Sequence, residues 1–289
     1  MDQTKIAKPD PGYRYEFVTS ELEAMSTCLS SHGFAILKGV LSDDFVERLK
    51  QAVWDGTDPN RTLQRGESKT RHAWIESGSG AWSLLQHESY MDIHRHVIGA
   101  DELTVNRSAA IVRMPDSAAV NWHCDWGGFY DGPPKSTGNL LNSGPWPSGS
   151  WFYLTGSRPA HGGLCVIEDS HVEGWEGPDG FVLTPGRASF YPEGEEPTGY
   201  GGFDVPGIVP LFADPGDLIL FAHRTYHGAF PNRIDEARLS CAMVFRDRNH
   251  RIDIPWEIPE PGRKFLKELP PHLHRYVDGY TSIDPQWKG

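Results

Sequence analysis

His123 and Asp125, in the segment NWHCD, are the residues whose types and spacing most directly indicate chemistry. On an extended strand, side chains two positions apart project to the same face, so the imidazole and the carboxylate converge while Cys124 faces away. Such a pair supplies two ligands to a metal ion. Because H-x-D also occurs by chance, with the carboxylate accepting a histidine N–H in a turn, the pair alone does not define a site.

A second segment, residues 217–247, contains a histidine that could be a third metal ligand and an arginine that could bind a carboxylate. His227 follows an apolar stretch, and Arg238 opens the next one, 11 positions further on. Two histidines and one carboxylate leave three positions of a six-coordinate metal open, which is the donor set of non-haem Fe(II) oxygenases. Ser240 shares the strand parity of Arg238, so both can face an interior where a guanidinium binds a carboxylate through two hydrogen bonds.

An alternative pairing within this segment is His223 with Arg233. His223 has the same strand parity as His227, four positions earlier. We favour His227 and Arg238 because the turn GAFPN directly follows His227 and because Arg238 opens an apolar strand. Arg233 lies in the polar stretch NRIDEAR, where a solvated side chain is expected.

The combined motifs resemble the phytanoyl-CoA dioxygenase family of Fe(II)/2-oxoglutarate oxygenases. The shared pattern is H-x-D, a distal histidine about a hundred residues later, and H-G-x-x-P-N-x-x-x-x-x-R. Three flanking stretches also agree with the family: IVRMPDSAAVNWHCD, LTGSRPAHGGLCVIEDSH and ADPGDLIL. The resemblance covers roughly residues 30–250. It departs from the family at 168–171, where EDSH replaces P-G-S-H, and the geometry of that turn is therefore in question.

The resemblance implies a complete catalytic site. His123, Asp125 and His227 would be the catalytic Fe(II) ligands, and Arg238, helped by Ser240, would anchor the C5 carboxylate of 2-oxoglutarate. The implied enzyme is a non-haem Fe(II)/2-oxoglutarate-dependent dioxygenase that also consumes O2. It would oxidise an unactivated C–H bond of a small organic molecule, with hydroxylation as the expected outcome and with release of succinate and CO2.

Two other functions remain open at this level. A zinc-type metal-dependent hydrolase or lyase can use the same two histidines and carboxylate. A non-catalytic jelly-roll module could bind a small molecule with the three residues serving only for packing. Arg238 and the strand pattern favour the oxygenase.

Aromatic residues directly after the metal motif are candidates for the substrate wall. These are Trp126, Phe129 and Tyr130, with plain packing as an equal alternative. Residues 126–150 and 173–207 are rich in Gly, Pro and aromatic residues. Long ordered connections of this kind usually act as lids or binding walls.

Short apolar segments between turns indicate the strands that must position these residues. The expected strands are 103–114, 151–154, 163–167, 208–212, 217–222 and 239–245. Helical patterns precede them at 20–31, where Ser20 and Glu23 have capping-box spacing, after Ser42, and at 82–97. We predict an α+β fold, mainly β: a double-stranded β-helix (jelly-roll, cupin-like) core with flanking N-terminal and C-terminal helices.

The expected organisation is a single Fe(II)/2-oxoglutarate dioxygenase domain over residues 1–289. Its jelly-roll core would span about 103–248, supported by helices in 18–100 and followed by a C-terminal tail, 249–289. The length of 289 residues is within the range of single-domain β folds.

Charge and cysteine usage limit the partners. The 27 basic and 39 acidic residues give a formal net charge of −12, which repels nucleic acid and anionic membranes. We therefore expect a small-molecule substrate and no nucleic-acid or membrane partner, and the oligomeric state stays open. The four cysteines form no C-x-x-C pair, and the N-terminus has no apolar signal core, which together indicate a cytoplasmic location.

Overall fold

The structure, a computed structural model, describes residues 2–129 and 132–289. Within these residues the strands form a seven-stranded sheet, a four-stranded sheet and a two-stranded pair. The large sheet contains, in spatial order, β1 (Glu16–Val18), β2 (Phe34–Lys38), β11 (Leu218–Phe221), β6 (Gly149–Tyr153), β13 (Arg238–Asp247), β4 (Leu103–Arg113) and β3 (Ser68–His72). The small sheet contains β10 (Ile208–Pro210), β7 (Leu164–Ile167), β12 (His227–Ala229) and β5 (Val120–His123). The pair is β8 (Phe181–Leu183) with β9 (Phe190–Pro192).

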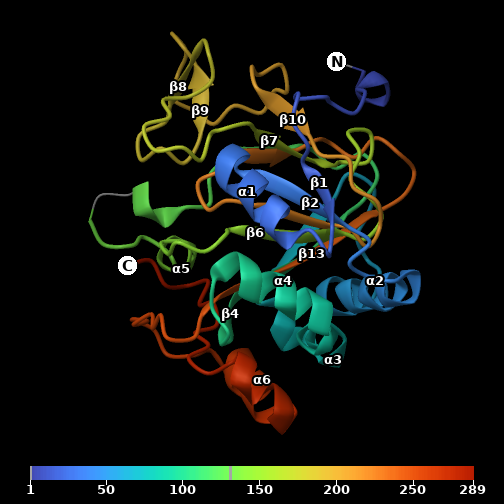
Figure 1. The fold of residues 1–289 in the computed structure, drawn as a ribbon, viewed down its shortest axis with the longest axis vertical. Coiled ribbons are helices and arrows are strands. Elements are labelled where there is room, and N and C mark those ends of the chain that lie inside the picture. Colours follow the sequence, from blue (N-terminus) through green and yellow to red (C-terminus); the bar gives the residue numbers. More distant parts are fainter. Residues whose placement is uncertain (1, 130–131) are drawn as a thin grey trace.

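Helices α1 (Leu22–His32), α2 (Asp43–Thr57) and α4 (Glu88–Ile98) pack on the large sheet, and α3 (Ser79–Trp82) packs against α2. Helix α5 (Thr137–Leu141) lies at a cavity between the two sheets, and α6 (Glu260–Glu268) packs against the 3-10 turn η2 (Trp74–Ser77). The other short 3-10 turns are η1 (Gln3–Lys5), η3 (Ser83–Gln86), η4 (Gly127–Phe129) and η5 (Pro271–Tyr276). Figure 1 shows α2, α3 and α4 gathered beside the large sheet, while β7, β10 and the β8–β9 pair lie away from them.

β13 packs against a helix with one face and lines a cavity with the other. Side chains alternate along a strand, so its odd-numbered and even-numbered residues face opposite ways. On one side, Phe245 packs against Tyr90 of α4, whose hydroxyl donates to the carbonyl of Met243. On the other side, Ala242 and Val244 line a cavity between the sheets. The strand is buried on both faces, which explains why residues 239–245 are apolar apart from Ser240.

The strands expected from the sequence are confirmed as β4, β6, β7, β10, β11 and β13. The expected helix after Ser42 is confirmed as α2, where the Ser42 hydroxyl accepts the N–H of Phe45 at 3.4 Å. The segment 18–100, expected as helical support, also supplies β2 and β3 to the large sheet.

Two expected helix starts are wrong. Helix α1 begins at Leu22, and Ser20 does not cap it. The residue before α1 is Glu21, whose carboxylate binds Arg14 and the N–H of Val18, so it closes the preceding turn instead. Helix α4 begins at Glu88 and not at residue 82, because His87 caps it by accepting the N–H of Tyr90.

All four cysteines are buried and free. Across the described part of the chain, the helices lack the length and apolar content needed to cross a lipid bilayer.

Candidate metal centre

Two neighbouring strands of the small sheet bring the metal-motif residues together. His123 ends β5, His227 begins β12, and the two residues are directly paired in the antiparallel register, with ring centroids 4.2 Å apart. Asp125 follows two positions after His123. Its Oδ1 lies 3.6 Å from His123 Nε2, and its Oδ2 lies 3.9 Å from His227 Nε2. One ligand atom from each residue therefore lies within 4.8 Å of the others.

Each imidazole is oriented by a backbone carbonyl two residues earlier. His123 Nδ1 lies 2.8 Å from the carbonyl of Asn121, and His227 Nδ1 lies 3.0 Å from the carbonyl of Thr225. A carbonyl can only accept, so Nδ1 carries the proton in both rings. Nε2 then keeps its lone pair free for a metal ion.

The charge states suit a divalent cation. Burial alone would raise the pKa of Asp125, but Arg107, His227 and His123 hold it well below its usual range, so the carboxylate is ionised. Burial, followed by repulsion from His123, lowers the pKa of His227 to about 4, which leaves that ring neutral at pH 7. Two imidazoles and one carboxylate fit Fe(II) in both ligand type and number.

The three residues open into a cavity of about 460 Å³ between the two sheets. Its floor is the inner face of β4 and β13, where the small side chains of Ala109 and Ala242 stand opposite each other and leave space. Its far wall is made by α5 and by the C-terminal residues 283–285, 287 and 288. A small organic molecule could reach the metal-ligand atoms inside this cavity.

Arg238 and Ser240 lie on the same row of β13 as the cavity-lining Ala242. Both side chains are buried, and Arg238 has no carboxylate partner among the described residues. Its Nη1 donates to the carbonyl of Gly162 at 2.9 Å, and its guanidinium lies 4.7 Å from the ring centre of Tyr153. Arg238 Nε and Ser240 Oγ are buried without a hydrogen-bond partner in the described chain. An unpaired buried cation is costly, so the arrangement favours an anionic ligand there.

Arg107 and His72 are cavity residues that the sequence reasoning missed. Arg107 Nη2 donates to Asp125 Oδ2 at 2.8 Å. His72, on β3, pairs with Ala109 of β4, so it lies on the same inner face. The available signal was the alternation along β4: positions 107, 109 and 111 all point into the cavity, and an arginine in such a row is a candidate site residue.

Trp126 and Phe129 are not among the residues that line this cavity. They contact each other edge to face at 4.3 Å, and the guanidinium of Arg224 lies 4.0 Å from the ring of Trp126. These contacts are the packing that the sequence left as the alternative, and a role in substrate binding stays a prediction. Tyr130 lies outside the described residues.

The alternative pairing of His223 and Arg233 is not brought together with Asp125. His223 packs against Trp126, with ring centres 5.5 Å apart, and Arg233 is exposed in its turn. The group of possible ligands around Asp125 contains His227, as favoured from the sequence.

The turn at 168–171 contains a left-handed residue at the position where the sequence departs from the family pattern. Asp169, which stands where the family pattern has glycine, adopts a φ of 58°, a left-handed conformation that Asp tolerates better than most residues. Ser170 Oγ donates to the carbonyl of Ile167 at 2.7 Å and accepts the N–H of Tyr226 at 2.9 Å. This turn thereby supports the approach to His227.

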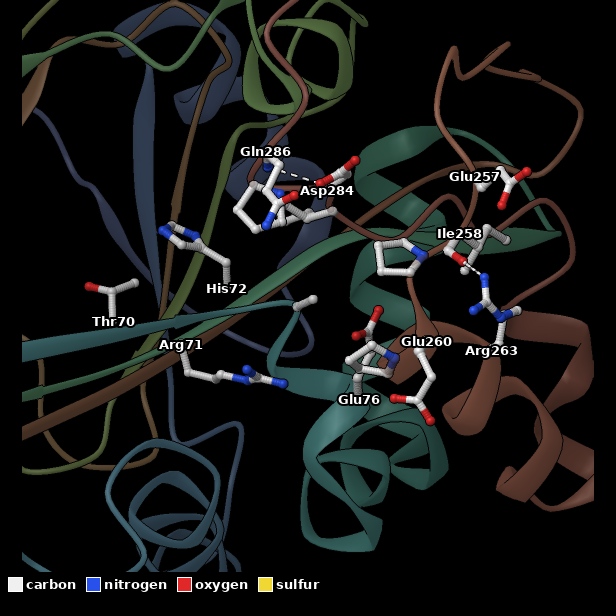
Figure 2. A pocket seen from close by; sticks show the side chains of 15 residues that line it. Thr70, Arg71, His72, Glu76, Glu257, Ile258, Glu260, Arg263, Asp284 and Gln286 are labelled. Atoms are coloured by element: carbon white, nitrogen blue, oxygen red, sulfur yellow. Dashed lines mark hydrogen bonds between the residues drawn. The ribbon is translucent and has the colours of Figure 1, made fainter.

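A second, more polar hollow of about 630 Å³ adjoins the cavity at β3. Figure 2 shows the carboxylates of Glu76 and Glu260 and the guanidinium of Arg263 around it. The two spaces share Thr70, His72, Ile283, Asp284 and Pro285. The cavity is therefore continuous at its rim with a surface that can bind polar groups.

Comparison with known proteins agrees with this geometry. A sequence model of the family described as phytanoyl-CoA dioxygenase (PhyH) matches residues 29–240. A 1-deoxypentalenic acid 11-beta-hydroxylase from Streptomyces arenae is 26% identical over 273 residues, which are 86% of this chain and 89% of the relative.

Solved structures give the same fold. The epimerase SnoN, in complex with Fe3+, alpha ketoglutarate and nogalamycin RO, aligns with a TM-score of 0.57 at 20% identity over 93% of this chain and 94% of its own. HygX from Streptomyces hygroscopicus, with nickel, 2-oxoglutarate and hygromycin B bound, also has a TM-score of 0.57, at 18% identity over 89% of this chain and 95% of its own.

The family match spans more than half of the chain, so the chain belongs to the phytanoyl-CoA dioxygenase family. It is an Fe(II)/2-oxoglutarate-dependent dioxygenase, as the sequence motifs predicted, with O2 as the second co-substrate.

Proposed function

We propose that His123, Asp125 and His227 hold Fe(II) and that Arg238, with Ser240, binds the C5 carboxylate of 2-oxoglutarate. The observation that carries this assignment is the juxtaposition of three side chains of metal-ligating type with a buried arginine that lacks a carboxylate partner in the described chain. The arginine lies in the strand row that continues into the cavity floor. When bound, Fe(II) with 2-oxoglutarate and O2 supplies the oxidising power, with release of succinate and CO2.

The protein contributes positions and a dry environment. The carbonyls of Asn121 and Thr225 fix the two imidazoles, and the charge of Arg238 sets the direction of the co-substrate. The cavity wall excludes bulk water and holds the reacting C–H bond of a small organic substrate near the open side of the triad. The outcome that we propose is hydroxylation.

The substrate that we propose has an apolar part and a polar part. Ala109, Ala242, Val244 and Trp151 line the inner cavity, whereas the adjoining hollow carries several carboxylates and guanidinium groups. The relatives named above act on or bind small organic molecules, which supports this choice. The family match favours the oxygenase over a zinc hydrolase or a non-catalytic binding module.

The architecture that we propose is one domain over residues 1–289 with a double-stranded β-helix core. The small sheet facing part of the large sheet, with the triad between them, supports this description. The strands that we assign to this core, β4–β7 and β10–β13, lie within 103–248, whereas β1, β2 and β3 extend the large sheet from outside that range.

The test uses purified protein with Fe(II) and 2-oxoglutarate under anaerobic conditions. The visible metal-to-ligand charge-transfer band should appear in the wild type and in a matched control, His223→Ala, and should be lost in His227→Ala and Asp125→Ala. Normal Fe(II)- and 2-oxoglutarate-dependent succinate release by Asp125→Ala would contradict the assignment. A succinate-release screen over a metabolite panel then identifies substrates, and a gain of one oxygen in the product mass would establish hydroxylation or epoxidation.

A further inference from the structure

We propose that Arg107 is a positioning residue that keeps Asp125 a one-oxygen metal ligand and so preserves the coordination position that O2 needs. This inference rests on the proposed function. It concerns a residue of β4 that no metal motif contains and that is 18 positions before Asp125 in the chain.

The guanidinium of Arg107 makes two bonds with a single nitrogen. Its Nη2 donates to Asp125 Oδ2 at 2.8 Å and to the carbonyl of Ser148 at 2.7 Å. The side chains of Arg107 and Asp125 are only 22% and 20% exposed, so this charge-assisted bond is largely shielded from water. With Oδ2 held in this way, Oδ1, which lies 3.6 Å from His123 Nε2, is the oxygen left for a metal ion.

The number of oxygens that Asp125 provides decides how many positions stay open. Metal-bound carboxylates bind through one or through both oxygens. A triad of three single ligands leaves three positions, enough for the two oxygens of 2-oxoglutarate and one O2. A two-oxygen Asp125 would fill one of these positions, and the 2-oxoglutarate complex would then have no place for O2.

Arg107 also connects the metal carboxylate to the segment that closes the cavity. Ser148 lies at the end of the 126–150 insertion, immediately before β6. The neighbouring Asn106 Nδ2 donates to the carbonyl of Leu141 at 2.8 Å, so two successive residues of β4 hold the same insertion. Thr137 Oγ1 of α5 donates in turn to the carbonyl of Asp284 in the C-terminal tail. The carboxylate is thus fixed by the residues that form the cavity wall.

The geometry of the sheet leaves Arg107 few other roles. Val244 of β13 is its partner in the register, and the adjacent positions are Ala109 and Ala242, which offer no acceptor. Its Nε is buried without a hydrogen-bond partner in the described chain, and within that part of the chain the two Nη2 bonds hold the guanidinium.

The test replaces Arg107 and uses nitric oxide as a neutral probe of the O2 position. Wild type, Arg107→Met and Arg107→Gln are loaded anaerobically with Fe(II), with and without 2-oxoglutarate, and the electron paramagnetic resonance signal of the nitric oxide adduct is measured. In both variants the signal should be retained without 2-oxoglutarate and should fall at least about tenfold with it, the effect expected from losing one hydrogen bond to a charged group. The matched control Arg158→Met removes another arginine–aspartate pair and should behave as wild type.

Two results would overturn the proposal. One is an equal nitric oxide signal in wild type and folded variants when 2-oxoglutarate is bound. The other is loss of Fe(II) binding in both variants, which would make Arg107 a residue for metal retention. Because nitric oxide is uncharged, loss of the arginine charge cannot by itself mimic the expected result. If the wild type fails to bind Fe(II) and 2-oxoglutarate at all, the proposed function fails instead.

Discussion

Single residues at this site are placed by contacts that also set their chemical state. The two imidazoles donate Nδ1–H to backbone carbonyls, and Asp125 is held ionised by Arg107. Arg238 differs from them, because it is a buried cation that still lacks an anionic partner in the described chain. The contribution of Arg238 to binding 2-oxoglutarate is therefore the most direct one to measure.

Arg238→Met should raise the Kd for 2-oxoglutarate about 10- to 100-fold, because a desolvated bond to a carboxylate contributes about 1.5–3 kcal/mol. Titration of the charge-transfer band gives this Kd. The control ligand is 2-oxopentanoate, which has the same chain length without the C5 carboxylate, and its Kd should change little. Equal weakening of both ligands would show that Arg238 supports the fold of the pocket and not the carboxylate.

At the scale of elements, η4 and α5, both within residues 126–150, are held together by one close contact between backbone atoms. A Cβ added to Gly127 in η4 would lie 2.0 Å from the backbone oxygen of Asn139 in α5. Glycine is the residue that permits this contact, since backbone cannot move aside as a flexible side chain can. The contact fixes α5, which forms part of the cavity wall.

Gly127→Ala should therefore loosen the insertion, at a cost of about 1–3 kcal/mol typical of overpacking. Limited proteolysis should cut within 126–150 faster than in wild type, and the Tm should fall. Gly138→Ala is the matched control, because its added Cβ would meet only Ser136 Oγ, at 3.7 Å. Equal cleavage rates in the two variants would contradict the importance of the η4–α5 contact.

At the scale of the whole molecule, helix packing on the large sheet buries a histidine. His94 of α4 is buried, its Nε2 lies 3.0 Å from Ser150 Oγ of β6, and its ring contacts Phe245 of β13. Burial lowers the pKa of His94 to about 3. The folded state thus keeps the ring neutral, whereas the unfolded chain takes up a proton below its ordinary pKa of 6.5.

Stability should therefore be full above about pH 6.5 and should fall as the pH drops from there toward 3, since the unfolded state binds the extra proton. The contribution of His94 to the slope is at most about 1.4 kcal/mol per pH unit. His94→Gln, which does not titrate, should flatten the pH dependence of the free energy of unfolding between pH 4 and 6 by about this amount. Ile93→Val is the control, because it should lower stability without changing the slope. An unaltered slope in His94→Gln would refute this account.

Much of the fold and of the site could be predicted because the responsible patterns are local. Six strands were expected within a few residues of their bounds, since alternation and turn residues act over short distances. His123 and Asp125 were expected on one face for the same reason. The start of α1 was missed because Glu21 binds Arg14, a contact that spacing within the helix does not indicate.

By itself, the sequence determined the donor set: two histidines and an aspartate, with an arginine 11 residues after the second histidine, in a chain whose apolar segments are strands. Tertiary structure alone decided that Arg107 binds Asp125, that His72 and the C-terminal tail line the cavity, and that Trp126 packs on Arg224. The physical reason is the distance along the chain over which each kind of information acts. Residue type and strand alternation are encoded position by position, whereas these contacts depend on strand register and on the packing of segments distant in the chain.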